Sequence, residues 1–420
     1  MNSPWLIRLN RVDCITLLSV PLTLLAISEV LQQRLMSALA LLYLAMTADA
    51  LDGMLARRWH LTRNFGRYLD GFMDVLIYLL TPALIVMQWG FTGAWLIPLG
   101  LMVGCGCIRL AVFNESGNLG EADNEANDEA SNDSSSESEP ELGSEPEPDS
   151  EPEPENSADG LAYQGMPVFW SLFIIAPLLW LNTLSWLPLL LTKVVLAVAL
   201  TLFSYLMVRK ARFFKFSSLA QILTLTLGGF TLWTLASEPQ GLAWSLLTAL
   251  YLQIPVVIGG VLHMVVVSRN YLPQLARPVW TRAFGVNKTW RGFVVVPALT
   301  ALGALLLLPL EWWLGERSPF AGYSLVFAGA IAGLGYMLGE LPNSLVKRRL
   351  GIAAGELPEQ GKLITIAVDQ LDSAVGVALA YLLWLGISLD VMAWYIVSFP
   401  LVALVVKNWL HKHALKQSAV

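Results

Sequence analysis

The sequence predicts an all-α, polytopic integral membrane protein with about twelve transmembrane helices in two helical bundles. Of its 420 residues, 55% are apolar and only 14% are charged, whereas soluble chains carry about 25% charged residues. Apolar runs of roughly 20 residues, the length that crosses a bilayer, recur along almost the whole chain. This composition excludes the ordinary globular, disulfide-stabilised and fibrous classes of protein.

We assign residues 1–240 to a first membrane domain and residues 241–420 to a second one, with the boundary near residue 240. The expected spans, in order, are 12–31, 35–56, 68–88, 93–112, 164–182, 187–208, 218–236, 242–266, 292–313, 320–340, 363–386 and 391–407.

Basic residues gather at one end of these spans. Of the 26 Lys and Arg residues, only Arg34, Lys193 and Arg317 fall toward the opposite side. Loops on the cytoplasmic side of a membrane are enriched in Lys and Arg. We therefore expect a multi-pass protein of the inner (cytoplasmic) cell membrane, with both termini on the cytoplasmic side and the lipid bilayer as its surroundings.

One stretch, residues 115–160, has a different composition. It holds 17 of the 32 acidic residues and no basic residue, and it ends in alternating Glu and Pro. Such a segment cannot bury enough apolar surface to offset its ordering entropy, so we predict a disordered acidic insertion. A solvated loop is the simpler interpretation, and an electrostatic tether for cations or a basic partner is the alternative.

Four aspartates form the first candidate site. Asp49 and Asp52 are three residues apart and Asp70 and Asp74 are four apart, so each pair shares one face of a helix. A short turn between the two helices would bring the four carboxylates together, and like charges at such density require cations. Oxygen ligands suit Mg²⁺ or Mn²⁺, and bridging phosphates would complete the coordination. Carboxylates inside apolar spans are costly, which favours a functional role.

The complete spacing Asp-x2-Asp-Gly-x2-Ala-Arg-x8-Gly-x3-Asp-x3-Asp resembles the signature of the CDP-alcohol phosphatidyltransferase family. Members of that family use a divalent-metal site to displace CMP from a CDP-linked lipid with an alcohol. The resemblance implies that Asp74 is also the catalytic base, because alkoxide formation requires a nearby proton acceptor. The implied metal ligands are Asp49, Asp52, Asp70 and Asp74, and the implied CDP-binding residues are Gly53, Ala56, Arg57 and Gly66.

The acceptor is indicated by two further segments. Residues 107–114, which include Arg109, and residues 164–167 resemble the segments around the fourth and fifth helices of membrane phosphatidylserine synthases. The resemblance implies L-serine as the acceptor and Arg109 as a substrate-binding residue. An alcohol phosphate such as glycerol phosphate stays open, because an arginine binds a carboxylate or a phosphate equally well.

A second candidate site is predicted in the C-terminal domain. Residues 284–292, 339–349 and 369–373 all approach the same end of their spans. They combine a Lys/Arg cluster with acidic side chains, and Asp369 and Asp372 share a helix face that could hold a metal. Basic groups beside a carboxylate-bound metal stabilise a transferring phosphoryl group. The alternative is that the basic residues only orient the spans.

Residues 245–420 resemble the CDP-archaeol synthase family and, more distantly, the phosphatidate cytidylyltransferases, through AsnLysThrTrpArgGly, SerLeuValLysArgArgLeuGly and AspGlnLeuAsp. Both families join CTP to a phosphorylated lipid and release pyrophosphate. The family has an aspartate at the position of Glu340. The glutamate keeps the negative charge but has a longer side chain. The resulting assignments are Lys347 and Arg348 as catalytic residues, Lys288, Arg291 and Ser344 as substrate-binding residues, and Glu340, Asp369 and Asp372 as metal ligands.

Together the two sites predict a bifunctional enzyme of phospholipid synthesis. The second domain would make a CDP-lipid from CTP and phosphatidate, and the first would pass the phosphatidyl group to a polar alcohol and release CMP. A monofunctional phosphatidyltransferase with a non-catalytic C-terminal domain is the alternative. A transporter is disfavoured, because the ionisable residues lie at one interface and the halves show no repeat. Nucleic acid is not expected as a partner, and a homodimer stays open.

Overall fold

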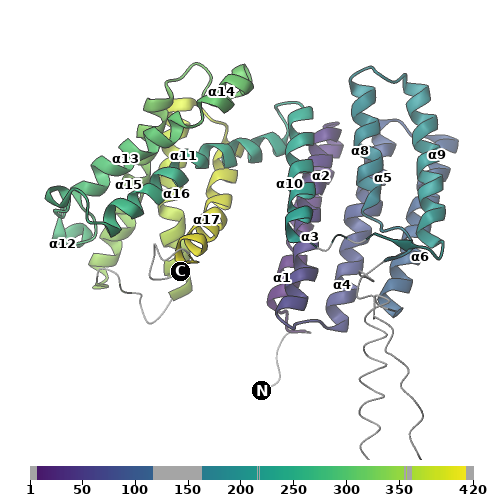
Figure 1. Cartoon of the computed structure of the whole chain (residues 1–420), viewed down its shortest axis with the longest axis horizontal. Coiled ribbons are helices and arrows are strands. Elements are labelled where there is room, and N and C mark those ends of the chain that lie inside the picture. Colours follow the sequence, from purple (N-terminus) through teal and green to yellow (C-terminus); the bar gives the residue numbers. More distant parts are fainter. Residues whose placement is uncertain are drawn as a thin grey trace, which may run out of the picture. The chain divides into compact units, whose positions relative to one another are not determined.

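The computed structural model describes residues 7–116, 163–214, 216, 218–353, 356 and 362–412. The chain is an all-α, polytopic membrane protein, as predicted (Figure 1). Most of the predicted acidic insertion, from residue 117 to residue 160, lies outside the described residues. Its predicted disorder therefore stays a prediction.

The chain divides into two compact units, residues 1–243 and 244–420. The sequence places the domain boundary at residues 240–241, just before a long helix that starts at Leu242. The elements of unit 1 are α1 (Arg11–Thr16), α2 (Ser19–Leu31), α3 (Leu35–Arg58), α4 (Asn64–Asp74), η1 (Val75–Leu80), α5 (Thr81–Trp89), η2 (Gly93–Trp95), α6 (Leu96–Ser116), β1 (Tyr163–Gln164), α8 (Trp170–Thr183), α9 (Leu189–Val208), β2 (Arg212–Phe213) and α10 (Leu219–Ala236).

The centre of unit 1 is α3, which packs against α1, α2 and α10. Its first half consists mainly of Ala, Leu and Met, which are strong helix formers. All residues of Met36–Ala48 except Leu44 are buried, as expected for a helix that is apolar on every side. The polar end of the same helix carries Asp49, Asp52 and Arg57, so the packed half fixes where these side chains lie.

A single long span, Asn64–Trp89, follows α3. Its middle, η1, is a π-helix of six residues that begins directly after Asp74. A π-helix shifts the backbone hydrogen bonds from the i+4 to the i+5 residue, and such turns occur often at functional sites. The side chains on either side of η1 therefore differ in orientation from those of an uninterrupted α-helix.

The strands β1 and β2 form an antiparallel pair, with Tyr163 opposite Phe213 and Gln164 opposite Arg212. The pairing continues through Gly165, whose amide donates to the carbonyl of Ala211 at 3.0 Å. It joins the segment before α8 to the segment after α9. We call residues 163–169, 211–214 and 216 the strap.

The last residues of unit 1 are held by the α2–α3 hairpin. The fully buried carboxylate of Glu29 accepts the backbone amide of Leu242 at 3.0 Å, and the hydroxyl of Ser37 accepts that of Ala243 at 3.2 Å. Arg34 pairs with Glu29 at 3.4 Å. The first amides of a helix have no partner within it, so the start of the next helix is capped from within unit 1.

Unit 2 is built around α15, which packs against α13 and α16. The buried core of unit 2 combines small residues such as Ala332 and Ala378 with Phe320, Tyr381 and Tyr395. The elements are α11 (Leu242–Ser268), η4 (Pro273–Leu275), α12 (Thr281–Phe284), α13 (Trp290–Leu305), α14 (Leu308–Leu314), η5 (Gly315–Arg317), α15 (Leu325–Arg349), α16 (Lys362–Leu385) and α17 (Leu389–Lys412).

The number of spans differs from the predicted twelve. Within the described residues, ten helices are long and apolar enough to cross a membrane, or eleven if a bent pair counts as one span. The predicted span 292–313 is this pair, Trp290–Leu305 and Leu308–Arg317, with a bend of 49°. Pro309 lies just after the break and has no backbone N–H to donate to the carbonyl of Leu305, which favours an interruption of the helix there.

The predicted span 164–182 is the other difference. Its helix, α8, covers only Trp170–Thr183, because the preceding residues form β1 and the turn at Gly165. Fourteen residues rise about 21 Å, less than the roughly 30 Å of a hydrocarbon core. The prediction of helix for residues 164–169, which rested on their hydropathy, is therefore wrong.

Candidate active sites

The turn between α3 and α4 brings the two pairs of aspartates together. It is held from the N-terminal side of the chain, because Arg63 forms an ion pair with the buried Asp13 and donates to the carbonyl of Arg8 at 3.1 Å. Asp13 is fixed in turn by a capping box with Asn10 at the start of α1. The predicted short turn is thus present and is held in place by charged residues that the sequence reasoning did not use.

All four aspartates line one cavity of about 180 Å³ in unit 1. Asp49 is close enough to contact both Asp70 and Asp74, and Asp52 is buried, with 3% of its surface exposed. The prediction that Asp49, Asp52, Asp70 and Asp74 converge on one pocket therefore agrees with the structure.

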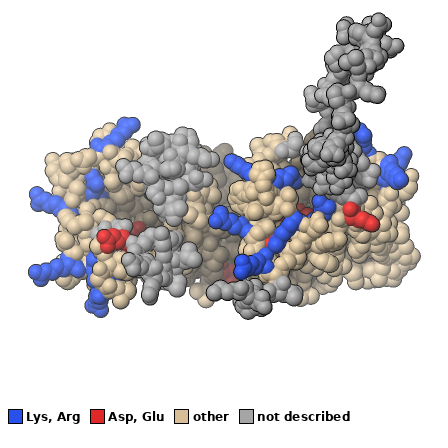
Figure 2. All heavy atoms as spheres, turned by 90° about the horizontal axis from the view of Figure 1, so that it is seen from below, with Lys and Arg blue, Asp and Glu red and all other residues tan. Residues whose placement is uncertain are grey.

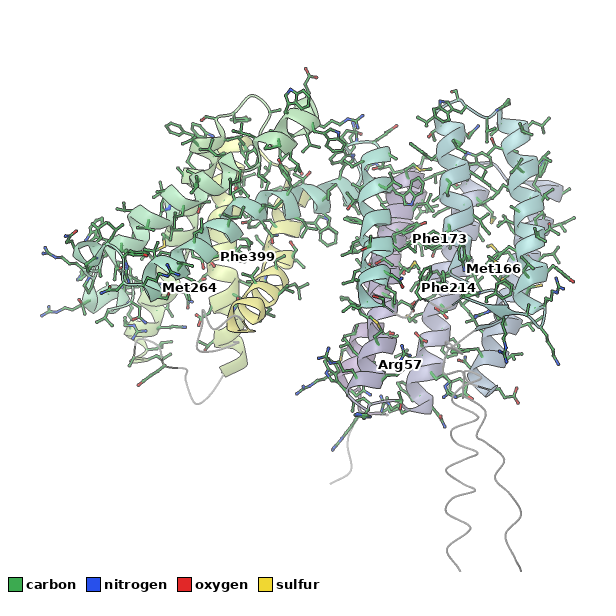
Figure 3. All side chains as sticks on the ribbon, in the orientation of Figure 1. Arg57, Met166, Phe173, Phe214, Met264 and Phe399 are labelled. Carbon is green, nitrogen blue, oxygen red and sulfur yellow. The ribbon has the colours of Figure 1, made fainter. Side chains whose placement is uncertain are left out.

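Two arginines share this cavity. Arg57 acts electrostatically on Asp52 and Asp70, and the largely buried Arg109 acts on Asp74. Arg109 comes from α6, whereas Arg57 lies at the end of α3 (Figure 3). The cavity thus combines a dense group of carboxylates with cationic side chains on two sides, an arrangement suited to a phosphorylated ligand held with cations.

Not every predicted binding residue lies on the cavity wall. Gly53, Arg57 and Arg109 line it, but Ala56 and Gly66 do not. A Cβ atom on Gly66 would lie 3.7 Å from a carboxylate oxygen of Asp13. Gly66 is therefore placed beside the ion pair that holds the turn.

The strap supplies an apolar wall that sequence reasoning did not assign. Pro167, Val168, Phe169 and Phe216 line the cavity, and the rings of Phe169 and Phe216 are 6.2 Å apart. Figure 3 shows Phe214 and Met166 on the strap segments of unit 1. The cavity is therefore lined by charged side chains on one part of its wall and by aromatic side chains on another, as an amphiphilic ligand would require.

The carboxylates of the unit 1 cavity fit a divalent cation. Among the described residues, no hydrogen-bond donor reaches Oδ1 of Asp49 or Oδ2 of Asp52, although both atoms are buried. Acceptor atoms without donors suit a hard cation. No three His, Cys, Asp or Glu side chains in the described ranges are placed as a metal site, so a cation at the four aspartates stays a prediction.

In unit 2, a glycine contact sets the second site. Gly335 and Gly339 are four residues apart on α15 and face Gly376 of α16, where the two backbones touch. Small residues at this spacing allow membrane helices to approach closely. The crossing places the next turn of α15, with Asn343, directly beside Asp372 of α16.

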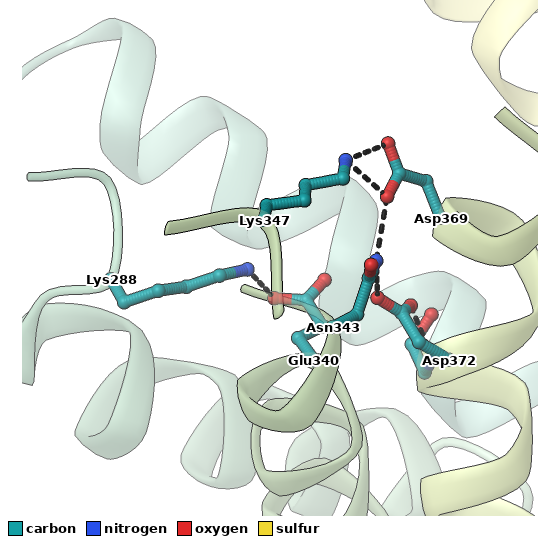
Figure 4. Close-up of polar contacts among 7 residues, drawn as sticks. Lys288, Glu340, Asn343, Lys347, Asp369 and Asp372 are labelled. Carbon is teal, nitrogen blue, oxygen red and sulfur yellow. Dashed lines mark hydrogen bonds and ion pairs between the residues drawn. The ribbon is translucent and has the colours of Figure 1, made fainter. Parts of the chain in front are cut away.

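A polar network forms at this crossing (Figure 4). The amide of Asn343 donates to Asp369 at 2.6 Å and to Asp372 at 2.7 Å. Lys347 donates to both oxygens of Asp369 at 2.5 and 2.6 Å, and Lys288 forms an ion pair with Glu340. The sequence analysis did not assign Asn343 to the site, because an uncharged amide does not stand out in an apolar span as a carboxylate does. Its position three residues after Glu340 does place it on the same helix face.

These residues line a cavity of about 270 Å³. Seven of the eight predicted residues of this site are among its walls, and Arg291 is not. Arg291 instead donates to Asn270 at 3.4 Å and to the carbonyl of Tyr271 at 3.3 Å, where it ties the loop before α13. The predicted residues on the wall are Lys288, Glu340, Ser344, Lys347, Arg348, Asp369 and Asp372.

An apolar groove of about 950 Å³ runs between α15 and α16. Its wall includes Leu338, Val346 and Leu383, which are 55%, 53% and 85% exposed. At one end the groove reaches Asn343 and Asp372, which also line the polar cavity. An open apolar groove thus ends at a charged cavity within unit 2.

The polar cavity of unit 2 fits a divalent cation less directly. Its carboxylates Asp369 and Glu340 are already paired with lysines, and Asn343 donates an N–H to each of two aspartates. The amide of Asn343 presents an oxygen ligand instead if it turns over, which its geometry allows. With the amide in that orientation, Asp369, Asp372 and Asn343 would be the residues that hold a cation.

The glycine crossing gives a testable prediction. A Cβ atom on Gly376 would lie 2.7 Å from the Cα of Gly339, so Gly376→Ala must push α15 and α16 apart. We expect a loss of about 1–3 kcal/mol in unfolding free energy, seen as a lower melting temperature in detergent. Gly260→Ala is the matched control, because a Cβ there meets nothing within 4 Å. Equal melting of the two variants would contradict the assigned contact.

Comparison with known proteins gives matches for parts of the chain. Residues 9–125 match the family model for CDP-alcohol phosphatidyltransferase. The chain is similar to the CDP-diacylglycerol–serine O-phosphatidyltransferase of Methanocaldococcus jannaschii, with 33% identity over 24% of this chain and 47% of that protein. The enzyme of the same name from Bacillus subtilis is 29% identical over 25% of this chain and 62% of its own length.

A different relative is the CDP-archaeol synthase of Staphylothermus marinus, which is 31% identical over 137 residues, 32% of this chain and 62% of that protein. The chain thus spans between about half and three fifths of the length of these relatives. The matched stretch 9–125 contains all four aspartates of the first cavity together with Arg57 and Arg109.

Proposed function

We propose that unit 1, whose residues 9–125 match the CDP-alcohol phosphatidyltransferase family, transfers a phosphatidyl group from a CDP-lipid to a polar alcohol and releases CMP. One observation carries the proposal. Four carboxylates and two arginines line a single cavity whose other wall is aromatic. This combination accommodates a pyrophosphate, its cations and the apolar part of a lipid substrate.

The chemistry follows from the side chains around the cavity. The acceptor oxygen forms a bond to the phosphatidyl phosphorus, the bond from this phosphorus to CMP breaks, and Asp74 receives the hydroxyl proton. Arg57 binds the negative phosphate oxygens of the CDP-lipid. Mg²⁺ or Mn²⁺ held by Asp49, Asp52, Asp70 and Asp74 would neutralise the pyrophosphate and lower the pKa of the acceptor hydroxyl.

L-serine is the proposed acceptor. Two of the relatives described above are named as serine O-phosphatidyltransferases. Arg109 lies on the cavity wall beside Asp74, where its guanidinium can bind the acceptor's carboxylate while the hydroxyl faces the base. The phosphate of an alcohol phosphate can bind Arg109 in the same way. The assay described next therefore distinguishes serine from an alcohol phosphate as the acceptor.

The assay uses the purified full-length protein in nanodiscs with CDP-diacylglycerol labelled in its cytidine. Serine, glycerol 3-phosphate and inositol phosphate are added in turn with Mg²⁺, and CMP and lipid products are separated by chromatography. We expect CMP release that depends on serine. No acceptor-dependent CMP release with any of the three would refute the proposed function.

A second activity is proposed for unit 2, the transfer of a cytidylyl group from CTP to a lipid phosphate such as phosphatidate. The supporting observation is that the apolar groove and the charged cavity meet at Asn343 and Asp372. A lipid chain in the groove therefore brings its phosphate to Lys288, Lys347 and Arg348. The similarity of the chain to a CDP-archaeol synthase supports the same chemistry.

In this reaction an oxygen of the lipid phosphate attacks the α-phosphorus of CTP, and the bond to pyrophosphate breaks. Lys347 and Arg348 stabilise the charge that develops on the phosphoryl oxygens. A divalent cation at Asp369 and Asp372 would hold the leaving pyrophosphate. The product would be the CDP-lipid that the proposed reaction of unit 1 consumes.

Labelled CTP and phosphatidate test the second activity in the same nanodiscs. We expect label to enter a CDP-lipid and pyrophosphate to be released without any added alcohol. If CTP is not consumed while CDP-diacylglycerol still supports CMP release, unit 2 is a non-catalytic domain and the protein is a monofunctional phosphatidyltransferase.

We further propose that the ends of the spans that carry both cavities face the cytoplasm. Within each unit, the charged side chains that Figure 2 shows are mostly Lys and Arg, as the positive-inside rule predicts for a cytoplasmic surface. This orientation would give both cavities access to soluble nucleotides and would agree with an inner-membrane location.

A further inference from the structure

We infer that Tyr78 is a positioning residue for the metal site proposed in unit 1, acting through Asp49. The inference rests on the proposed function only in so far as both require a cation at the four aspartates. It concerns the orientation of the Asp49 carboxylate and does not depend on which alcohol is the acceptor.

The first observation is the bond between the two side chains. The Tyr78 hydroxyl donates to Oδ2 of Asp49 at 2.7 Å, and Tyr78 is buried, with 1% of its surface exposed. The other carboxylate oxygen, Oδ1, is buried and receives no hydrogen bond from any described residue. One oxygen of Asp49 is therefore held by the phenol, and the other is left for a ligand in the cavity.

The second observation is that Tyr78 is itself held from two sides. The Ser171 hydroxyl, fully buried on α8, donates to the Tyr78 carbonyl at 2.6 Å, and the Tyr78 ring packs edge-on against Phe169 at 6.4 Å. Tyr78 belongs to the π-helix η1. Ser171 thus adds a hydrogen bond from α8 to the backbone of η1, and the contact with Phe169 orients the phenol ring.

The consequence concerns the affinity for a cation. Partners that orient a ligating carboxylate typically change metal affinity by about 10–100-fold when they are removed. Tyr78→Phe removes only the hydroxyl and keeps the ring, so Asp49 becomes free to rotate without loss of packing. We expect weaker metal binding by the variant and little change in folding.

The test measures Mn²⁺ binding to the full-length protein in detergent by the electron paramagnetic resonance signal of free Mn²⁺. All variants carry Asp369→Asn and Asp372→Asn, so that unit 2 does not contribute. Tyr78→Phe should raise the dissociation constant by about tenfold or more. The matched control is Tyr43→Phe, since Tyr43 is equally buried in unit 1 but packs on Phe173 and Trp233, away from the cavity.

Wild-type Mn²⁺ affinity in Tyr78→Phe, or equal loss in Tyr43→Phe, would overturn the inference. Ser171→Ala is a second variant that leaves the phenol in place, and it should weaken Mn²⁺ binding to a smaller extent. Where transferase activity is present, excess metal should restore the kcat of Tyr78→Phe. Tight Mn²⁺ binding without any CMP release would reject the proposed function and leave the role of Tyr78 intact.

Discussion

Asp74→Asn is expected to lower acceptor-dependent CMP release by about 10²–10⁴-fold, the usual contribution of a general base. The amide keeps the shape of the side chain but cannot take a proton from the acceptor hydroxyl. Asp74 also lies beside Asp49, Asp70 and Arg109, so the loss combines a missing base with a weakened ligand set. The measurement is CMP release from CDP-diacylglycerol in nanodiscs at saturating serine.

The control for Asp74→Asn is the activity proposed for unit 2 of the same protein. The same variant should still incorporate CTP label into CDP-lipid at the wild-type rate, because unit 2 contains a cavity of its own. The CDP-lipid should then accumulate. Retention of more than a tenth of the wild-type transfer rate would contradict the role of Asp74 as base.

Lys347→Gln is expected to lower CTP-dependent formation of CDP-lipid by about 10²–10³-fold, the effect of removing one group that stabilises charge in a transition state. Lys347 donates to both oxygens of Asp369 and lines the cavity that the groove enters. Glutamine removes the positive charge and retains most of the length. The measurement is incorporation of labelled CTP into lipid with phosphatidate in excess.

Arg349→Gln is the matched control for Lys347→Gln. Arg349 lies two residues later on the same helix end and is exposed, and it is not part of the cavity wall. If basic residues here only orient α15, the two variants should behave alike. A selective loss in Lys347→Gln, with transfer from supplied CDP-diacylglycerol unchanged, is the expected outcome.

The sequence predicts the carboxylates of both sites for a physical reason. An ionised side chain in an apolar span is costly, so the four aspartates of the first cavity stand out against the apolar residues around them. The same reasoning identifies Asp369 and Asp372. Nearness to these residues in the sequence does not place a residue on the cavity wall. Gly66 lies beside Asp13, and the side chain of Arg291 turns toward the loop before α13.

The missed residues are those whose importance depends on geometry. Tyr78 lies in an apolar run, where a tyrosine is an ordinary core residue, and only its position four residues after Asp74 suggests a shared face. Asn343 and Phe169 carry no charge that would mark them. The π-helix at η1 and the short α8 depend on tertiary packing and on the strap, which hydropathy does not describe.

The capped start of α11 has a consequence for how the chain can be divided in experiments. Domains are commonly joined by an exposed, flexible linker, at which proteases cut and the domains can be separated. Here the boundary between the two units lies within one helix, whose first residues, Leu242 and Ala243, are held by Glu29 and Ser37. A cut before residue 242 would strip Glu29 of its amide partner and leave α11 uncapped, so each half would have to be repaired before it could be studied alone.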